Sequence, residues 1–130
     1  MKLQHKLLVF FFSLLISTFS FAQKKVASPA ETVSGKINGA TITIKYGSPS
    51  VKGRAIWGAL VPYDKVWRAG ANDATTFETD KTITIEGKQL PAGKYSFFVI
   101  PNENESIIIF NKEAKQWGSY DYKASSDQLR

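Results

Sequence analysis

The feature that most constrains the fold is an alternation of apolar and polar residues with a period of two. Residues 40–46 (ATITIKY) are apolar at even-numbered positions and polar at odd-numbered ones, which is typical of a strand with one buried and one solvated face. The preceding pair, Asn38-Gly39, is favoured in a type I′ turn, because both residues must take a positive φ. The pattern predicts a β-hairpin over residues 32–47.

Further extended segments follow at short intervals. Residues 81–87 (KTITIEG) alternate again, whereas residues 94–101 (KYSFFVIP) and 106–111 (SIIIFN) are apolar on both faces, as in central strands of a covered sheet. Turn signals recur roughly every eight to twelve residues, and no segment has a sustained helical period. We therefore expect an all-β fold: a single-domain antiparallel β-sandwich, jelly-roll-like or barrel-like, with little helix beyond the first 22 residues.

The N-terminus has the composition of a signal peptide. Lys2 and Lys6 precede an apolar run over 7–16, and small residues at Ser20 and Ala22 fit a cleavage site between Ala22 and Gln23. The run is shorter than the roughly 20 residues of a membrane-spanning helix, although an uncleaved anchor remains the alternative. No cysteine follows that would carry a lipid. We expect a secreted or periplasmic protein with a signal peptide over 1–22, a flexible leader over 23–31 and a sandwich domain over 32–130.

Cleavage removes Met1 and His5, which are the methionine and the histidine of this cysteine-free chain. The mature chain then lacks the usual ligands of zinc, copper, haem and iron–sulfur sites. It also lacks the residues for disulfides and for histidine-activated nucleophiles. Calcium would need only oxygen ligands, but no D-x-D-x-D-G loop occurs. We therefore expect neither metal nor cofactor.

The charge is basic but dispersed. Loss of Lys2 and Lys6 lowers the formal net charge from +6 to +4, and the remaining basic residues are scattered apart from Lys24-Lys25. No basic stripe with interleaved aromatics predicts nucleic-acid binding. Attraction to anionic glycans or envelope lipids remains open on charge alone. The expected partner is a polar ligand or an envelope protein, and the expected state is a monomer or weak oligomer without a membrane span after cleavage.

Residues 66–80 (VWRAGANDATTFETD) are the most chemically crowded stretch. One interpretation is a tight corner between strands, in which Arg68 pairs with Asp73, Glu78 or Asp80 while Asn72 and the threonines cap free backbone groups. If exposed, such an ion pair would contribute about 0–1 kcal/mol to the free energy of unfolding. If it were buried, removing one partner would cost about 3–5 kcal/mol.

The other interpretation is a binding site. Aromatic rings beside amides and charged groups at loop ends are typical equipment for a polar ligand such as a sugar. The candidate ligand-binding residues are Trp57, Tyr63, Trp67, Arg68, Asn72, Asp73, Thr75, Glu78 and Trp117.

A carboxylate-based, glycosidase-like hydrolase is the alternative function, and a purely structural scaffold is a third. Without histidine, acid–base chemistry would fall to Asp64, Asp73, Glu78 and Asp80, two of which would have to lie about 5–9.5 Å apart. A neighbouring Arg68 would lower the pKa of such a carboxyl, where a general acid needs it raised. We assign no catalytic residues.

Three motifs give a family resemblance. The runs SPxxKGRxIWGxLVPYxKVWRAGANxAT, LPAGxYSxFxIP and IIFNKExxQWGxYxY, with a final DxLR, resemble the bacterial family called domain of unknown function 2911, from Ala27 to Arg130. The resemblance implies an exported protein, largely of Bacteroidetes-type bacteria, and supplies no activity, ligand or catalytic residue. Members commonly extend beyond the position of Arg130, where this chain stops as a strand begins. Either that sheet edge is left open or the natural product continues, and the resemblance favours a C-terminally truncated form.

Overall fold

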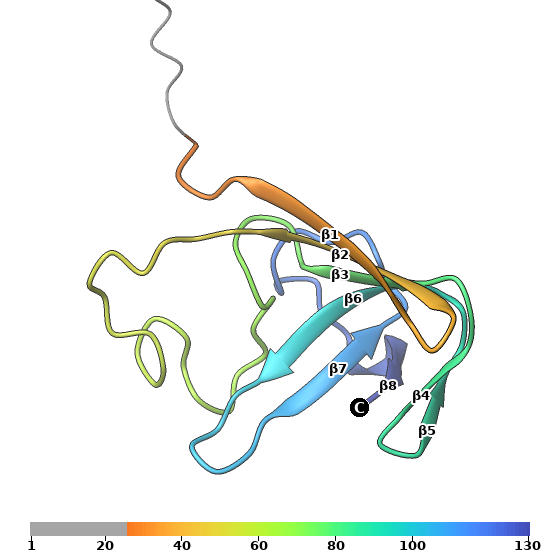
Figure 1. Ribbon diagram of the computed structural model, residues 1–130. Coiled ribbons are helices and arrows are strands. Elements are labelled where there is room, and N and C mark those ends of the chain that lie inside the picture. Colours follow the sequence, from red (N-terminus) through yellow and green to blue (C-terminus); the bar gives the residue numbers. More distant parts are fainter. Residues whose placement is uncertain (1–25) are drawn as a thin grey trace, which may run out of the picture.

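The computed structural model describes residues 26–130 (Figure 1). The predicted signal peptide (1–22), its cleavage site at Ala22 and Gln23, and the first part of the predicted leader lie outside the described residues. The first strand begins at Ala30. Residues 30 and 31, predicted as leader, therefore belong to the sheet.

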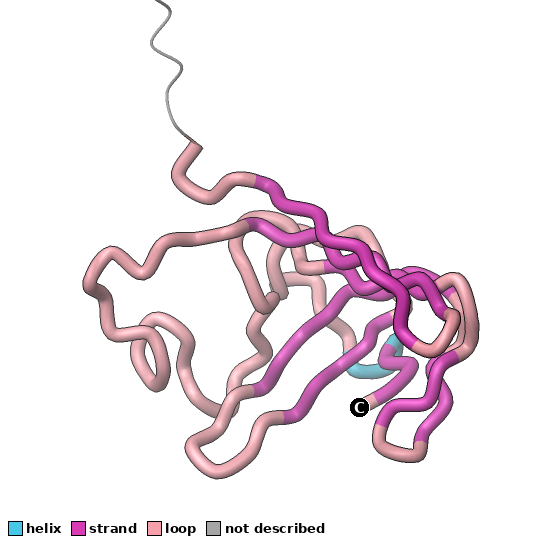
Figure 2. The backbone as a smooth tube through the Cα atoms, viewed as in Figure 1, coloured by secondary structure: helices cyan, strands magenta, loops and turns pink. Residues whose placement is uncertain are grey.

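Two antiparallel sheets make up the fold (Figures 1 and 2). The larger has the order β1-β2-β3-β6-β7-β8, and the smaller pairs β4 with β5. One turn of 3₁₀ helix, η2 (Ala124–Ser126), precedes β8. The strands are β1 (Ala30–Ile37), β2 (Ala40–Gly47), β3 (Thr76–Thr79), β4 (Ile83–Ile85), β5 (Lys88–Leu90), β6 (Gly93–Ile100), β7 (Ile107–Asn111) and β8 (Asp127–Leu129).

The β1–β2 hairpin forms as its sequence predicts. Asn38 and Gly39 take φ values of 49° and 81°, the left-handed conformations of a type I′ turn. Pairing then runs without a register shift from Ile37 opposite Ala40 to Ala30 opposite Gly47. The two-residue turn therefore sets which side chains of β1 and β2 share a face.

The small sheet covers part of one face of the large sheet and leaves β1 exposed. Leu90, Tyr95 and Phe110 form a buried cluster, against which Ile83 and Ile85 of β4 pack. The Phe77 and Phe110 rings meet edge-to-face at 5.1 Å between centroids, an arrangement that aromatic pairs prefer.

Loops cover much of the opposite face. Its core comprises Ala74, Phe98 and Ile109, with Val66 and Tyr122 packed against them from loop segments. The all-β prediction is confirmed, and the sheets do not close into a barrel. Among the described residues, the second sheet contains only β4 and β5. Loop segments pack against other parts of the large sheet.

The prediction that residues 106–111 form a covered central strand is wrong for Ile107 and Ile108. Ile109 is fully buried, whereas Ile107 and Ile108 are 41% and 39% exposed. β8 pairs with β7 only at Phe110 and Asn111. The first half of β7 therefore has no strand on its outer side.

Candidate functional site

The stretch 66–80 pairs with β6 at both of its ends, and a loop separates the two paired parts. Trp67 and Val99 exchange backbone hydrogen bonds of 2.8 and 2.9 Å, so the segment before the loop runs along β6 in line with β3. The Thr75 N–H donates to the Arg68 carbonyl at 3.2 Å, and the Thr75 hydroxyl donates to the Ala69 carbonyl at 3.1 Å. Residues 69–74 therefore leave the sheet between the two paired parts and form a loop whose ends are joined by hydrogen bonds; we call it the 69–74 loop.

The 69–74 loop is fastened to two distant segments by its backbone. Ala71 N–H donates to the Gly47 carbonyl at 3.2 Å, at the end of β2. Ala74 N–H donates to the Gln116 carbonyl at 3.0 Å, and Gly118 N–H donates to the Asn72 carbonyl at 3.1 Å. Asn72 takes a left-handed φ of 64°, which Asn tolerates better than most residues. The corner interpretation of this stretch therefore describes its backbone correctly.

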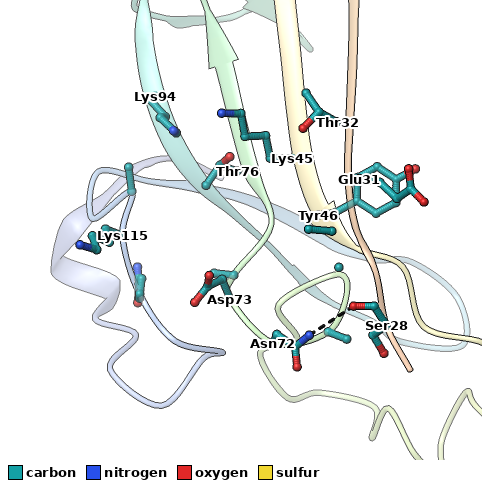
Figure 3. Close-up of a pocket in the computed structure, with 16 residues that line it drawn as sticks. Ser28, Glu31, Thr32, Lys45, Tyr46, Asn72, Asp73, Thr76, Lys94 and Lys115 are labelled. Carbon is teal, nitrogen blue, oxygen red and sulfur yellow. Dashed lines mark hydrogen bonds between the residues drawn. The ribbon is translucent and has the colours of Figure 1, made fainter. Parts of the chain in front are cut away.

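A groove of about 410 Å³ lies beside the loop, over β1, β2 and β3; we call it the β1–β3 groove. Thr32 pairs with Lys45 and Lys45 pairs with Thr76, and directly paired residues point to the same face of a sheet. These three side chains therefore form one row across the floor. Asn72 and Asp73 line the groove from the 69–74 loop (Figure 3).

Three lysines line the groove: Lys45 on β2, Lys94 on β6 and Lys115 on the segment after β7 (Figure 3). All three residues are exposed. Across residues 26–130 one ion pair occurs, between Arg130 Nε and Asp127 Oδ2 at 2.7 Å. The lysines of the groove are therefore not neutralised by a contacting carboxylate of the described chain.

A buried polar network supports the wall that carries Lys115 and Gln116. Asn111 is fully buried, and its amide donates to the Lys123 carbonyl at 3.0 Å and to Asp127 Oδ1 at 2.8 Å. Gln116 Nε2 donates to Asn111 Oδ1 at 3.2 Å and to the Glu113 carbonyl at 2.7 Å. This network holds the segment after β7 against the sheet.

Sequence reasoning missed most of this site. Lys45, Lys94 and Lys115 look like scattered surface charges, although Lys45 occupies a defined position in an alternating strand. Asn111 gives a clearer signal, because it directly follows the apolar run ending at Phe110. A polar residue in a buried strand needs partners, and that requirement points to a buried network.

The predicted aromatic candidates do not line the β1–β3 groove. Trp57 and Trp67 meet edge-to-face at 5.6 Å, and the Tyr63 ring lies against Gly58. Trp117, 58% exposed, forms a backbone bridge with Asp73 but is not part of the groove wall. The structure thus separates an aromatic cluster from the polar groove.

The predicted ion pair of Arg68 with Asp73, Glu78 or Asp80 is wrong. The guanidinium lies near Gly118, with Nη1 3.4 Å from where a Cβ on that glycine would stand. Arg68 Nε is buried and has no hydrogen-bond partner in the described chain. Arg68 and these acids are close in sequence but do not meet in the fold. Arg68 lies near Gly118, and Asp80 accepts a hydrogen bond from the Thr41 backbone N–H.

The remaining polar candidates have other roles. Thr75 is buried and bonded to the loop backbone, and Glu78 is exposed on β3 opposite Thr43 and Lys94. Neither residue lines the groove.

The carboxylates proposed for acid–base chemistry are dispersed. Asp64 accepts a 2.8 Å hydrogen bond from the Asn102 amide and lines a different cavity. Asp80 Oδ1 accepts a 2.7 Å hydrogen bond from the Thr41 backbone N–H, and this bond holds the pKa of Asp80 below its ordinary value of 3.8. A lowered pKa keeps Asp80 ionised, the opposite of what a general acid requires. Of the four, only Asp73 lines the β1–β3 groove.

In the described chain, no group of three or more histidine, cysteine, aspartate or glutamate side chains is placed to hold a metal ion. The same residues contain no helix that is long and apolar enough to cross a bilayer.

Comparison with known proteins gives one positive result. Neither the curated proteins nor the solved structures contain a match to this chain. Residues 28–130 match the family described as "Protein of unknown function (DUF2911)". The match covers every strand that the structure describes in residues 26–130, and the chain therefore belongs to the DUF2911 family.

Proposed function

We propose that this protein is a non-catalytic, exported module that binds a polar ligand in the β1–β3 groove. The observation that carries the proposal is a set of polar residues that line the groove and whose side chains have no ion-pair partner among residues 26–130: Lys45, Lys94, Lys115, Asp73, Thr32 and Thr76. The groove volume of about 410 Å³ falls within the roughly 300–1,000 Å³ of small-molecule sites.

The backbone of the 69–74 loop supports recognition over simple scaffolding. Ala71, Asn72 and Ala74 already have backbone partners in Gly47, Gly118 and Gln116. The Asp73 side chain is therefore carried on a fixed backbone, yet it forms no ion pair within residues 26–130. A fixed loop loses little conformational entropy when it binds, which favours affinity.

The export part of the proposal rests on residues 1–22, whose charged start, apolar run and small-residue end are those of a signal peptide. N-terminal sequencing of the protein recovered from its native envelope or culture fluid should begin at Gln23. A mature protein that begins at Met1 would contradict export by this route.

The binding part is tested by titrating the mature protein with neutral, acidic and amino monosaccharides and disaccharides, using isothermal calorimetry. Asp73→Ala should weaken the best ligand about tenfold or more, the usual effect of losing one charge-assisted contact. Asp121→Ala is the matched control, because Asp121 is exposed and does not line the groove. Equal affinity of the two variants would place the ligand elsewhere.

Trp117 offers a second readout, because its backbone pairs with that of Asp73 while its side chain is exposed. Binding in the groove should change the tryptophan emission of the wild type. The change should shrink in Trp117→Phe and persist in Trp57→Phe. The reverse pattern would assign the ligand to the aromatic cluster of Trp57 and Trp67.

A further inference from the structure

We propose that the ligand of the β1–β3 groove is a hydroxylated molecule bearing a carboxylate or phosphate, held by Lys45 together with Lys94 and Lys115. This inference rests on the proposed function and specifies its ligand class.

Lys45 stands between two uncharged cross-strand partners in the described sheet. Opposite charges commonly stand across from one another on neighbouring strands. Both cross-strand partners of Lys45 are threonines, Thr32 on β1 and Thr76 on β3. Its ammonium therefore has hydroxyls on both sides and no carboxylate directly across.

Lys94 and Lys115 add to the same positive region from other segments. Lys94 stands opposite Glu78 in the strand register, but the two side chains do not form an ion pair. Lys115 lies on the wall held by the Asn111 and Gln116 network. Three cations from separate segments thus line one groove, and like charges attract an anion more strongly together than singly.

The carboxylates near the groove do not cancel this charge. Glu31 also lines it, but Glu31 pairs with Tyr46, and neighbouring residues of a strand point to opposite faces. The Glu31 side chain therefore belongs to the face opposite Thr32 and Lys45, and Figure 3 shows it beside Tyr46. Asp73 lines the groove on the lysine side. Glu78, opposite Lys94, shares that face but does not line the groove. Three lysines against these two carboxylates leave an excess of positive charge.

The rest of the groove suits hydroxyl groups. Asp73 supplies acceptors, and the Thr32 and Thr76 hydroxyls supply both donors and acceptors. Gln116, which lines the groove and is 8% exposed, has a buried Oε1 without a donor in the described chain. Buried acceptors are normally hydrogen-bonded, and a water or a ligand hydroxyl that reaches this atom would supply the missing donor.

The test titrates the mature protein with four probes at low and high salt: glucose, glucuronic acid, glucose 6-phosphate and inorganic phosphate. Glucuronic acid or glucose 6-phosphate should bind about tenfold or more tightly than glucose, as one charge-assisted contact provides. The advantage should diminish in high salt, because exposed charges are screened. The tighter binder of glucuronic acid and glucose 6-phosphate shows whether the groove prefers a carboxylate or a phosphate.

Lys45→Gln should weaken the acidic sugar about tenfold more than it weakens glucose, as expected for one lost ionic contact. Lys36→Gln is the matched control, because Lys36 is an exposed lysine of β1 outside the groove. Both variants should keep the wild-type circular dichroism spectrum.

The outcomes separate the two proposals. If glucose binds as tightly as the acids and Lys45→Gln changes nothing, the anionic ligand class is overturned while groove binding stands. If inorganic phosphate binds as tightly as glucose 6-phosphate, the hydroxylated part is overturned. If no probe binds and the broader panel also fails, both proposals are overturned.

Discussion

The Ala71 backbone nitrogen lies 3.2 Å from the Gly47 carbonyl oxygen, joined by a hydrogen bond that fastens the 69–74 loop to the end of β2. The two backbones approach so closely that a Cβ added to Gly47 would collide with the Ala71 carbonyl. Gly47 does not have a positive φ. A glycine is needed there because of this close approach, and the groove depends on it.

We predict that Gly47→Ala destabilises the protein by about 1–3 kcal/mol, the usual cost of forcing extra atoms into a packed contact. The melting temperature should fall by several degrees for a domain of this size. Gly35→Ala, also in the β1–β2 hairpin, has no atom within 4 Å of the added Cβ and should melt near the wild type. Indistinguishable melting of Gly47→Ala and wild type, measured by calorimetry, would contradict this packing.

Asn111→Leu should be the most destabilising single change in the polar network. It removes the donor to Asp127 and Lys123 and the acceptor for Gln116, and each buried partner left unsatisfied costs about 1–3 kcal/mol. Urea denaturation should show a large drop in the midpoint. Asn104→Ala, at an exposed turn position, is the control and should unfold like the wild type.

Asp80 should make stability depend on pH in the acid range. Its pKa is lowered in the fold by the Thr41 backbone N–H, with the ordinary value at 3.8. The ionised group therefore stabilises the fold above pH 3.8, and this contribution disappears as pH falls through the lower folded pKa. Wild type should be more stable than Asp80→Asn at pH 7, and the difference should vanish in strong acid. A constant difference across thermal melts from pH 7 to 2 would argue against this assignment.

Tyr122 should make the stability of the protein depend on pH in the alkaline range. Burial, followed by its hydrogen bond to Asp127, raises the pKa of Tyr122 above 10.0. A raised folded pKa gives stability that is complete below pH 10 and is lost as pH rises through the folded value. Tyr122→Phe should be less stable at neutral pH, because Asp127 and Arg130 lose a partner, and its stability should fall less steeply above pH 10. Parallel profiles for the two proteins would be the contrary result.

The parts of the fold that the sequence predicts are those encoded locally. Asn38-Gly39 fixes a turn between adjacent residues, and the alternation after it fixes which side of β2 is buried. Asn72 in the 69–74 loop was also recognisable, since a left-handed residue between strands favours Asn.

The groove was not predictable in the same way. Lys45 and Lys115 come together only through strand order and through the bonds from Ala74 to Gln116 and from Gly118 to Asn72. Arg68 illustrates the same limit of sequence reasoning. Asp73, Glu78 and Asp80 are close to it in sequence, but none forms an ion pair with it in the described residues. Chemistry that depends on long-range pairing leaves little trace in a single sequence.

The fastening of the 69–74 loop to both β2 and the segment around Gln116 has a consequence for biosynthesis. A ribosome must deliver residues 113–118 before the last wall of the β1–β3 groove can exist. A nascent chain that has folded its first hairpin therefore still lacks the wall formed by Lys115 and Gln116, so the proposed binding site is complete only after most of the described residues have been synthesised and assembled.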